Sequence, residues 1–236
     1  MNDLESKIIE IPLTIQEEDV WRVMGAKDRI TKELKDEAAF AIKEISRLSD
    51  SKAIVKRFKI SSVTPKGIKF ETGEELVNKF ASHLFKGAEE AFFIISTIGS
   101  EVDKRISELM IKGENILAII LDSAGTAAAF NSFTYILDKL LEETTSRDLK
   151  MGTCLRPGQS YWDITGQTLI FNMLEAKKID VELLSSSFMK PQKSQSGIVP
   201  IGSNLLIQED PSESYCKYCK ASRCPMRIEP YQALKA

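Results

Sequence analysis

Apolar residues recur every three or four positions along two long segments, which predicts two amphipathic helices. The first covers residues 28–48, and the second covers residues 114–141, the most apolar long segment of the chain. This spacing matches the 3.6 residues of a helical turn, so one face of each helix is expected to be buried. The same pattern over shorter stretches predicts helices at 74–85, 100–112 and 165–177. Ser100 followed by Asp103 resembles a capping box at the start of one of them.

Other segments have the alternating or continuous apolar pattern of strands. Residues 90–98 form a continuous β-branched and aromatic run that ends at a glycine, which predicts a buried central strand. Residues 53–60 and 67–70 flank a Thr-Pro-Lys-Gly turn and predict a pair of strands. Residues 8–15 predict an edge strand or a docked arm, because Pro12 interrupts the alternation. Residues 197–206 predict a hairpin.

The composition indicates a globular protein of one large domain or two small ones. The chain has 236 residues, 43% of them hydrophobic and 28% charged, with a formal net charge of -2. The charge gives no basic excess for nucleic acid. The longest apolar runs are far shorter than the ~20 residues of a membrane span, and the first ten residues lack the pattern of a secretory signal. We therefore expect a cytoplasmic protein with neither a nucleic acid nor a membrane as partner.

Histidine and cysteine are distributed unusually. The single histidine, His83, excludes a metal site built from several histidines. Three cysteines form a C-x2-C-x4-C run near the C-terminus, at Cys216, Cys219 and Cys224. In a reducing compartment, such a run more often binds a metal or a cluster than forms disulfides. Three thiolates leave a tetrahedral site incomplete, so we expect Cys154 to supply the fourth ligand. The alternative is a set of free thiols.

Two polar segments contain side chains suited to binding a small molecule. In residues 156–163, Arg156 offers a fork of donors for a carboxylate, and Tyr161 offers a flat ring with a polar tip. Gly158 between them allows a ligand to approach the backbone. Residues 184–198 form a hydroxyl-rich segment with two lysines. Each segment is equally compatible with an ordinary solvated loop.

Together these motifs resemble the reactivation domain of cobalamin-dependent methionine synthase. Members of that family read R-P-x-P-G-Y and then L-T-E-S-x-A-M-x-P-x-x-S-V-S-G. Here the two motifs are RPGQSY at 156–161 and LLSSSFMKPQKSQSG at 183–197. Residues 91–129 resemble the helix-rich half of stand-alone relatives, and residues 216–227 resemble their C-x2-C-x4-C-P-x-R ending.

The resemblance implies a specific function. The family domain binds S-adenosylmethionine and presents its methyl group to cob(II)alamin as an electron arrives. By position, Arg156 would contact the methionine carboxylate, the backbone near Gly158 would approach the ligand, and Tyr161 would lie beside it. No side chain need act as a catalytic nucleophile. The cobalamin would be carried by a separate corrinoid protein or a methionine synthase, and an external donor would supply the electron. The cysteine run would add an iron–sulfur cluster or zinc.

The resemblance also implies an α+β fold, a single C-shaped domain with a twisted, mainly antiparallel sheet flanked by the helices at 28–48, 100–112 and 114–141. We expect an N-terminal arm and helix at 1–50, a reactivation-domain-like core at 51–210 and a cysteine-rich tail at 211–236. Two other functions remain open. The family Glu of the second motif is absent here, which favours a non-catalytic scaffold that binds a corrinoid protein without using S-adenosylmethionine. A small zinc-binding protein is the other alternative.

Overall fold

The computed structural model describes residues 5–26, 30–159, 161–206 and 219–221, together with residues 224, 227, 230 and 231. The strands are β1 Lys7–Glu10, β2 Lys52–Thr64, β3 Gly67–Phe70, β4 Glu75–Leu76, β5 Glu90–Thr97, β6 Lys150–Met151, β7 Glu182–Leu183, β8 Met189–Lys190 and β9 Ser194–Gly202. The helices are α1 Glu17–Met24, α2 Lys32–Leu48, α3 Lys79–Leu84, α4 Glu101–Ile111, α5 Asn115–Thr145 and α6 Gln167–Met173.

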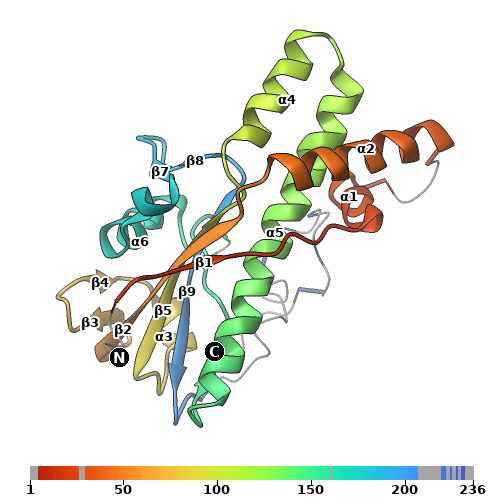
Figure 1. The fold of residues 1–236 in the computed structure, drawn as a ribbon. Coiled ribbons are helices and arrows are strands. Elements are labelled where there is room, and N and C mark those ends of the chain that lie inside the picture. Colours follow the sequence, from red (N-terminus) through yellow and green to blue (C-terminus); the bar gives the residue numbers. More distant parts are fainter. Residues whose placement is uncertain are drawn as a thin grey trace.

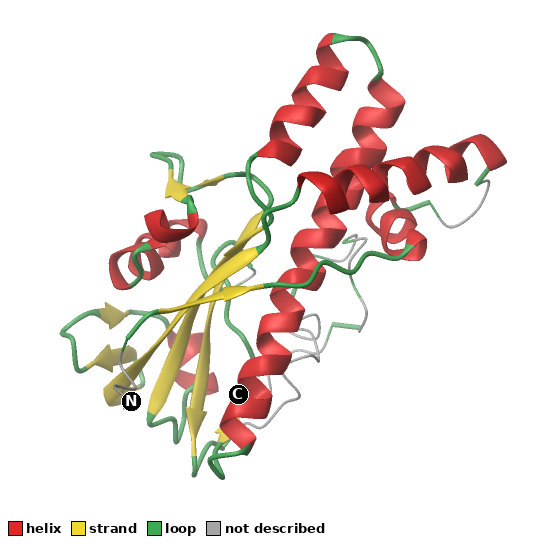
Figure 2. Ribbon diagram, viewed as in Figure 1, coloured by secondary structure: helices red, strands yellow, loops and turns green. Residues whose placement is uncertain are grey.

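A strongly curled antiparallel sheet forms the lower half of the molecule (Figures 1 and 2). Within the described residues it has seven strands, in the order β4-β3-β2-β5-β9-β6, and β1 pairs with the first half of β2. The expected central strand is confirmed, because β5 lies between β2 and β9 along its whole length. The expected strand pair at 53–60 and 67–70 is also present as β2 and β3.

The centre of the sheet is buried on both faces, which explains the continuous apolar run in β5. Ala91, Phe93 and Ile95 point to the face covered by α3 and α6. Phe92 and Ile94 point to the opposite face, where the C-terminal half of α5 packs. Because successive side chains of a strand alternate between faces, a strand with two apolar faces shows no alternation in its sequence.

Helix α5 extends beyond the sheet and carries a separate helical lobe (Figure 1). Its N-terminal half packs with α1, α2 and α4 around a third apolar cluster. The expectation that helices at 28–48 and 100–112 flank the sheet needs correction, since they cover α5 instead. Among the described residues, α5 alone is long and apolar enough to cross a membrane, but 61% of its most apolar window is buried inside the protein.

Three local expectations were wrong. Residues 197–206 form no hairpin, because β9 continues through Pro200 to Gly202 as a strand beside β5. The predicted capping box is absent, because the Asp103 carboxylate instead accepts a hydrogen bond from the backbone N–H of Gln192, at 2.7 Å. The helix predicted over 74–85 begins only at Lys79. Before it, β4 pairs with β3, and the Asn78 side chain caps the helix by accepting from the Ala81 N–H, at 2.9 Å.

Candidate functional site

The two motif segments meet beside strand β9. Leu155 and Ile198 form an isolated antiparallel bridge with mutual backbone hydrogen bonds of 2.8 and 2.9 Å. This bridge holds the loop that begins at Arg156 against the strand that ends the second motif. Segments that lie some 40 residues apart in the sequence therefore become neighbours in space.

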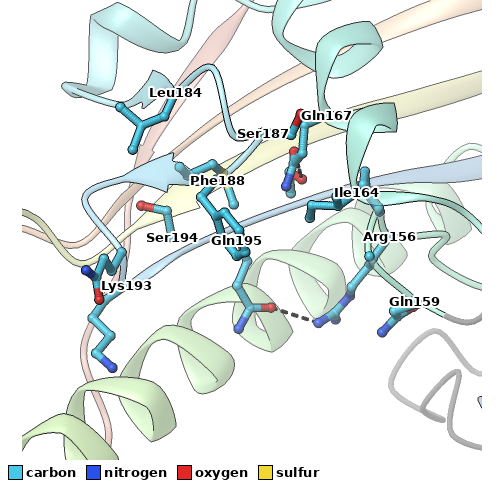
Figure 3. Close-up of a pocket in the computed structure, with 15 residues that line it drawn as sticks. Arg156, Gln159, Ile164, Gln167, Leu184, Ser187, Phe188, Lys193, Ser194 and Gln195 are labelled. Atoms are coloured by element: carbon cyan, nitrogen blue, oxygen red, sulfur yellow. Dashed lines mark hydrogen bonds between the residues drawn. The ribbon is translucent and has the colours of Figure 1, made fainter. Parts of the chain in front are cut away.

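A cavity of about 700 Å³ lies between the two segments (Figure 3). All of its lining residues come from 156–167 and 184–196, which are the two motifs and the start of α6. Ile164, Leu184 and Phe188 give it apolar walls, while serine and glutamine side chains supply hydrogen-bonding groups. Small-molecule sites have this size and this mixture of apolar walls with a few polar groups.

Arg156 is fixed at one side of the cavity. Its Nη1 donates a hydrogen bond to Oε1 of Gln195, at 2.7 Å. The guanidinium also lies over the ring of Phe133, with 4.2 Å to the ring centroid, and near the ring of Phe130, at 5.7 Å. An arginine has five N–H donors, so the bond to Gln195 leaves donors to pair with an anionic group. Stacking on α5 holds the planar group in one orientation.

Of the other two predicted ligand residues, one lines the cavity and the other is placed elsewhere. Gly158 lines it in a left-handed conformation, with φ 84°, which favours glycine. Tyr161 is not among the lining residues. Its ring is stacked on Phe80, with centroids 4.3 Å apart, and its carbonyl accepts from Asn78 Nδ2, at 2.7 Å. The hydrogen bond with the Tyr231 hydroxyl raises the pKa of Tyr161.

Sequence reasoning missed several polar residues of the cavity. The Ser196 hydroxyl donates a 2.6 Å hydrogen bond to Oε1 of Gln167, so the second motif is tied to α6. The hydroxyl of Ser194 lies 2.8 Å from the carbonyl of Pro191. Gln195 positions Arg156. The available signal was the S-x-S pattern itself, because alternate residues of a strand share a face, which puts Ser194 and Ser196 together.

Two of the four cysteines expected to share a metal belong to different apolar clusters. Cys154 packs with Phe133 on the α5 face of the sheet, whereas Cys219 packs near Tyr161 against the cluster on the opposite face. Gly197 makes room for Cys154, since a Cβ there would lie 2.5 Å from its Sγ. Cys224 is exposed, and Cys216 lies outside the described residues. Within the described part of the chain, no group of three or more His, Cys, Asp or Glu is arranged to hold a metal ion.

The Cys154 thiol should resist alkylation in the folded protein. Burial raises its pKa, and the nearby Arg156 guanidinium offsets only part of that rise. The thiolate is the reactive form of cysteine. At pH 8, iodoacetamide should therefore modify Cys224, while Cys154 stays unmodified until the chain is unfolded in guanidinium chloride. Peptide mass mapping at several times measures both rates. Equal labelling of the two residues in native buffer would contradict the buried placement.

Comparisons with known proteins identify the fold. No protein-family model matches the chain, and no curated protein matches it by sequence. Among solved structures, it is similar to the crystal structure of the MetH reactivation domain bound to AdoHcy, with a TM-score of 0.61 and 15% identity. The match covers 88% of this chain and 81% of that chain. The similarity confirms the expected α+β fold with a mainly antiparallel sheet.

Proposed function

We propose that this chain is a reactivation-type protein that binds an S-adenosylmethionine-type ligand in the cavity beside β9. The observation that carries the proposal is the meeting of the two motif segments, with Arg156 and Gly158 in one cavity. The structural neighbour of the same fold was solved with AdoHcy, which is the demethylated form of that ligand. We place the protein in the cytoplasm and its partner among corrinoid proteins or cobalamin-dependent methionine synthases.

In this proposal the protein positions reactants and supplies no nucleophile. Arg156 pairs with the ligand carboxylate, and the apolar walls at Ile164 and Phe188 exclude water from the rest of the ligand. An external donor reduces cob(II)alamin on the partner to cob(I)alamin. The cobalt then attacks the methyl carbon, the C–S bond breaks, and its electron pair remains on sulfur as a thioether. Holding the two reactants in line can lower a barrier by ~7–11 kcal/mol in favourable cases.

Direct titration tests ligand binding. In an isothermal titration, S-adenosylmethionine or S-adenosylhomocysteine should give a saturable signal with one site per chain. Ligand at about 100 times its Kd should also stabilise the fold by about 2.7 kcal/mol, which a thermal melt detects as a rise in Tm. Adenosine and methionine added separately serve as controls. No heat and no Tm shift with millimolar amounts of either adenosyl ligand would contradict the proposal.

We further propose that the cysteine tail binds an iron–sulfur cluster or zinc, without Cys154 as a ligand. The placement of Cys219 beside Tyr161 supports a site close to the loop that begins at Arg156. The opposite placement of Cys154 argues against it as the fourth ligand. A cluster would supply one-electron chemistry when bound. Anaerobic purification should yield iron with a visible charge-transfer band, or zinc. Protein with neither metal would contradict this site.

One observation favours a second candidate, a scaffold that binds the corrinoid protein without using S-adenosylmethionine. The described residues that line the cavity include Arg156 and Lys193 but no carboxylate. A sulfonium ligand bears a positive charge, and a lining without carboxylates offers it no direct ion-pair partner. Under this candidate, the protein should capture the corrinoid partner in a pull-down, while the titrations above give no signal.

A further inference from the structure

Lys193 joins the cavity wall to helix α5. It immediately precedes β9, lines the cavity and is only 8% exposed. Its Nζ donates to Oδ1 of Asp122, at 2.7 Å, and to Oγ1 of Thr126, at 2.9 Å. Figure 3 shows its side chain extending toward α5, apart from the amide group of Gln195. The ammonium is therefore held by two partners on one helix.

The surroundings of Lys193 fix this position. Its carbonyl accepts a hydrogen bond from the Ile98 N–H, at 3.1 Å, which ties it to the end of β5. On α5, a Cβ at Gly125 would lie 3.2 Å from Cε of Lys193, so the lysine stem uses the space that glycine leaves. The preceding residue is anchored as well, since the Gln192 N–H donates to Asp103. The backbone bonds therefore fix where the lysine stem begins, and the bonds to Asp122 and Thr126 fix where it ends.

The pair controls which charge the cavity presents. The Asp122 side chain is 48% exposed, whereas the Lys193 side chain is only 9% exposed. The described contacts bring two carboxylates to lining residues in this part of the wall, Asp122 to Lys193 and Asp103 to the N–H of Gln192. The Lys193 ammonium and the Arg156 guanidinium offset these two charges, so the wall keeps no uncompensated negative charge to attract a sulfonium. Losing the Lys193 charge would leave an excess of negative charge, which favours a positively charged ligand.

We propose that Lys193 is a specificity-determining residue, which makes the cavity bind the uncharged adenosyl thioether in preference to the positively charged adenosyl sulfonium. The inference rests on the proposed function, because it concerns ligands of that same cavity. A preference for the thioether would also affect the rate of turnover. The thioether formed by methyl transfer would be held at least as tightly as the donor, so release of the product would limit repeated use of the site.

The test is the ratio of two dissociation constants, that of S-adenosylmethionine divided by that of S-adenosylhomocysteine. For the unmodified protein the ratio should exceed 1. Lys193→Met keeps the buried stem but removes the charge, and it should lower the ratio about three- to tenfold, mainly through tighter S-adenosylmethionine binding. Lys193→Gln keeps a donor for Asp122 and should have the same effect. Asp122→Asn leaves the ammonium uncompensated and should raise the ratio.

Lys190→Met is the matched control, since it removes one exposed lysine from the same segment outside the cavity lining. Its ratio should equal that of the unmodified protein. If both ligands bind but neither Lys193 variant changes the ratio, the role of Lys193 is overturned while the proposed function stands. If one Lys193 variant fails to fold, Asp122→Asn and the other Lys193 variant still show in which direction the ratio changes. If neither ligand binds the unmodified protein, both proposals are overturned.

Discussion

Replacing Phe93 with alanine should lower the free energy of unfolding by about 3–5 kcal/mol. Phe93 is 0% exposed and lies in β5, at the centre of the sheet. Its ring meets the rings of Phe58 and Phe70 edge to face, with centroids 5.0 and 5.1 Å apart. Alanine removes both ring contacts and leaves a cavity that the surrounding strands cannot close. Urea unfolding followed by circular dichroism measures the loss.

Phe40→Ala is the matched control for this prediction. Phe40 lies on α2 and is 44% exposed, so its truncation removes less buried area and opens no closed cavity. The substitution should lower the free energy of unfolding by less than about 1 kcal/mol. A loss for Phe93→Ala as small as that of Phe40→Ala would mean that the described core around β5 is wrong.

Replacing Arg156 with alanine should weaken binding of S-adenosylhomocysteine about 10- to 100-fold, without lowering Tm by more than a few degrees. The range corresponds to the loss of a hydrogen-bonded charged group that pairs with the ligand carboxylate. Arg156→Lys should recover only part of the affinity, because an ammonium lacks the planar fork and cannot stack on Phe133 in the same way. Calorimetric titration gives all three constants.

Arg47→Ala is the matched control, because it removes an arginine from a part of the chain outside the cavity. Arg47 lies on α2, where it pairs with Glu44 within the same helix. Exposed pairs of this kind contribute little to stability, and this one lies outside the cavity lining. Its ligand affinity should match that of the unmodified chain. Unchanged affinity in Arg156→Ala, with the ligand still bound at one site, would remove Arg156 from the binding site.

The pattern of hydrophobic residues correctly predicted the elements whose buried surface can be read directly from their own sequence. The central strand at 90–98 and the helix at 114–141 were found with small changes at their ends, as β5 and α5. The hairpin at 197–206 was wrong because Pro200 and the turn residues after it suggested an interruption. The proline is accommodated inside β9, where its carbonyl still accepts from Gly152, at 2.9 Å. Which surface a helix covers depends on tertiary packing, so the pattern could not show that α2 packs on α5.

The site was predictable in part, because its two motifs resemble those of a known family. That resemblance named Arg156 and Gly158, which line one cavity. It could not show that Tyr161 stacks on Phe80, because that contact depends on where α3 packs. Nor could spacing along the chain show that Cys154 faces α5, since its direction is set by the bridge between Leu155 and Ile198. The role proposed for Lys193 depends on its ion pair with Asp122, which lies 71 residues away in the sequence, so spacing along the chain could not indicate it.

Helix α5 makes the two halves of the molecule thermodynamically dependent on each other. One end supplies a wall of the helical lobe, and the other end supplies a wall of the sheet core. Neither cluster can lose its order without exposing apolar surface of the same helix, so the chain should unfold as one cooperative unit. A ligand beside β9 touches residues that are bound to α5 through Lys193 and Arg156. Its binding energy would therefore slow amide hydrogen exchange even in the distant helices of the lobe.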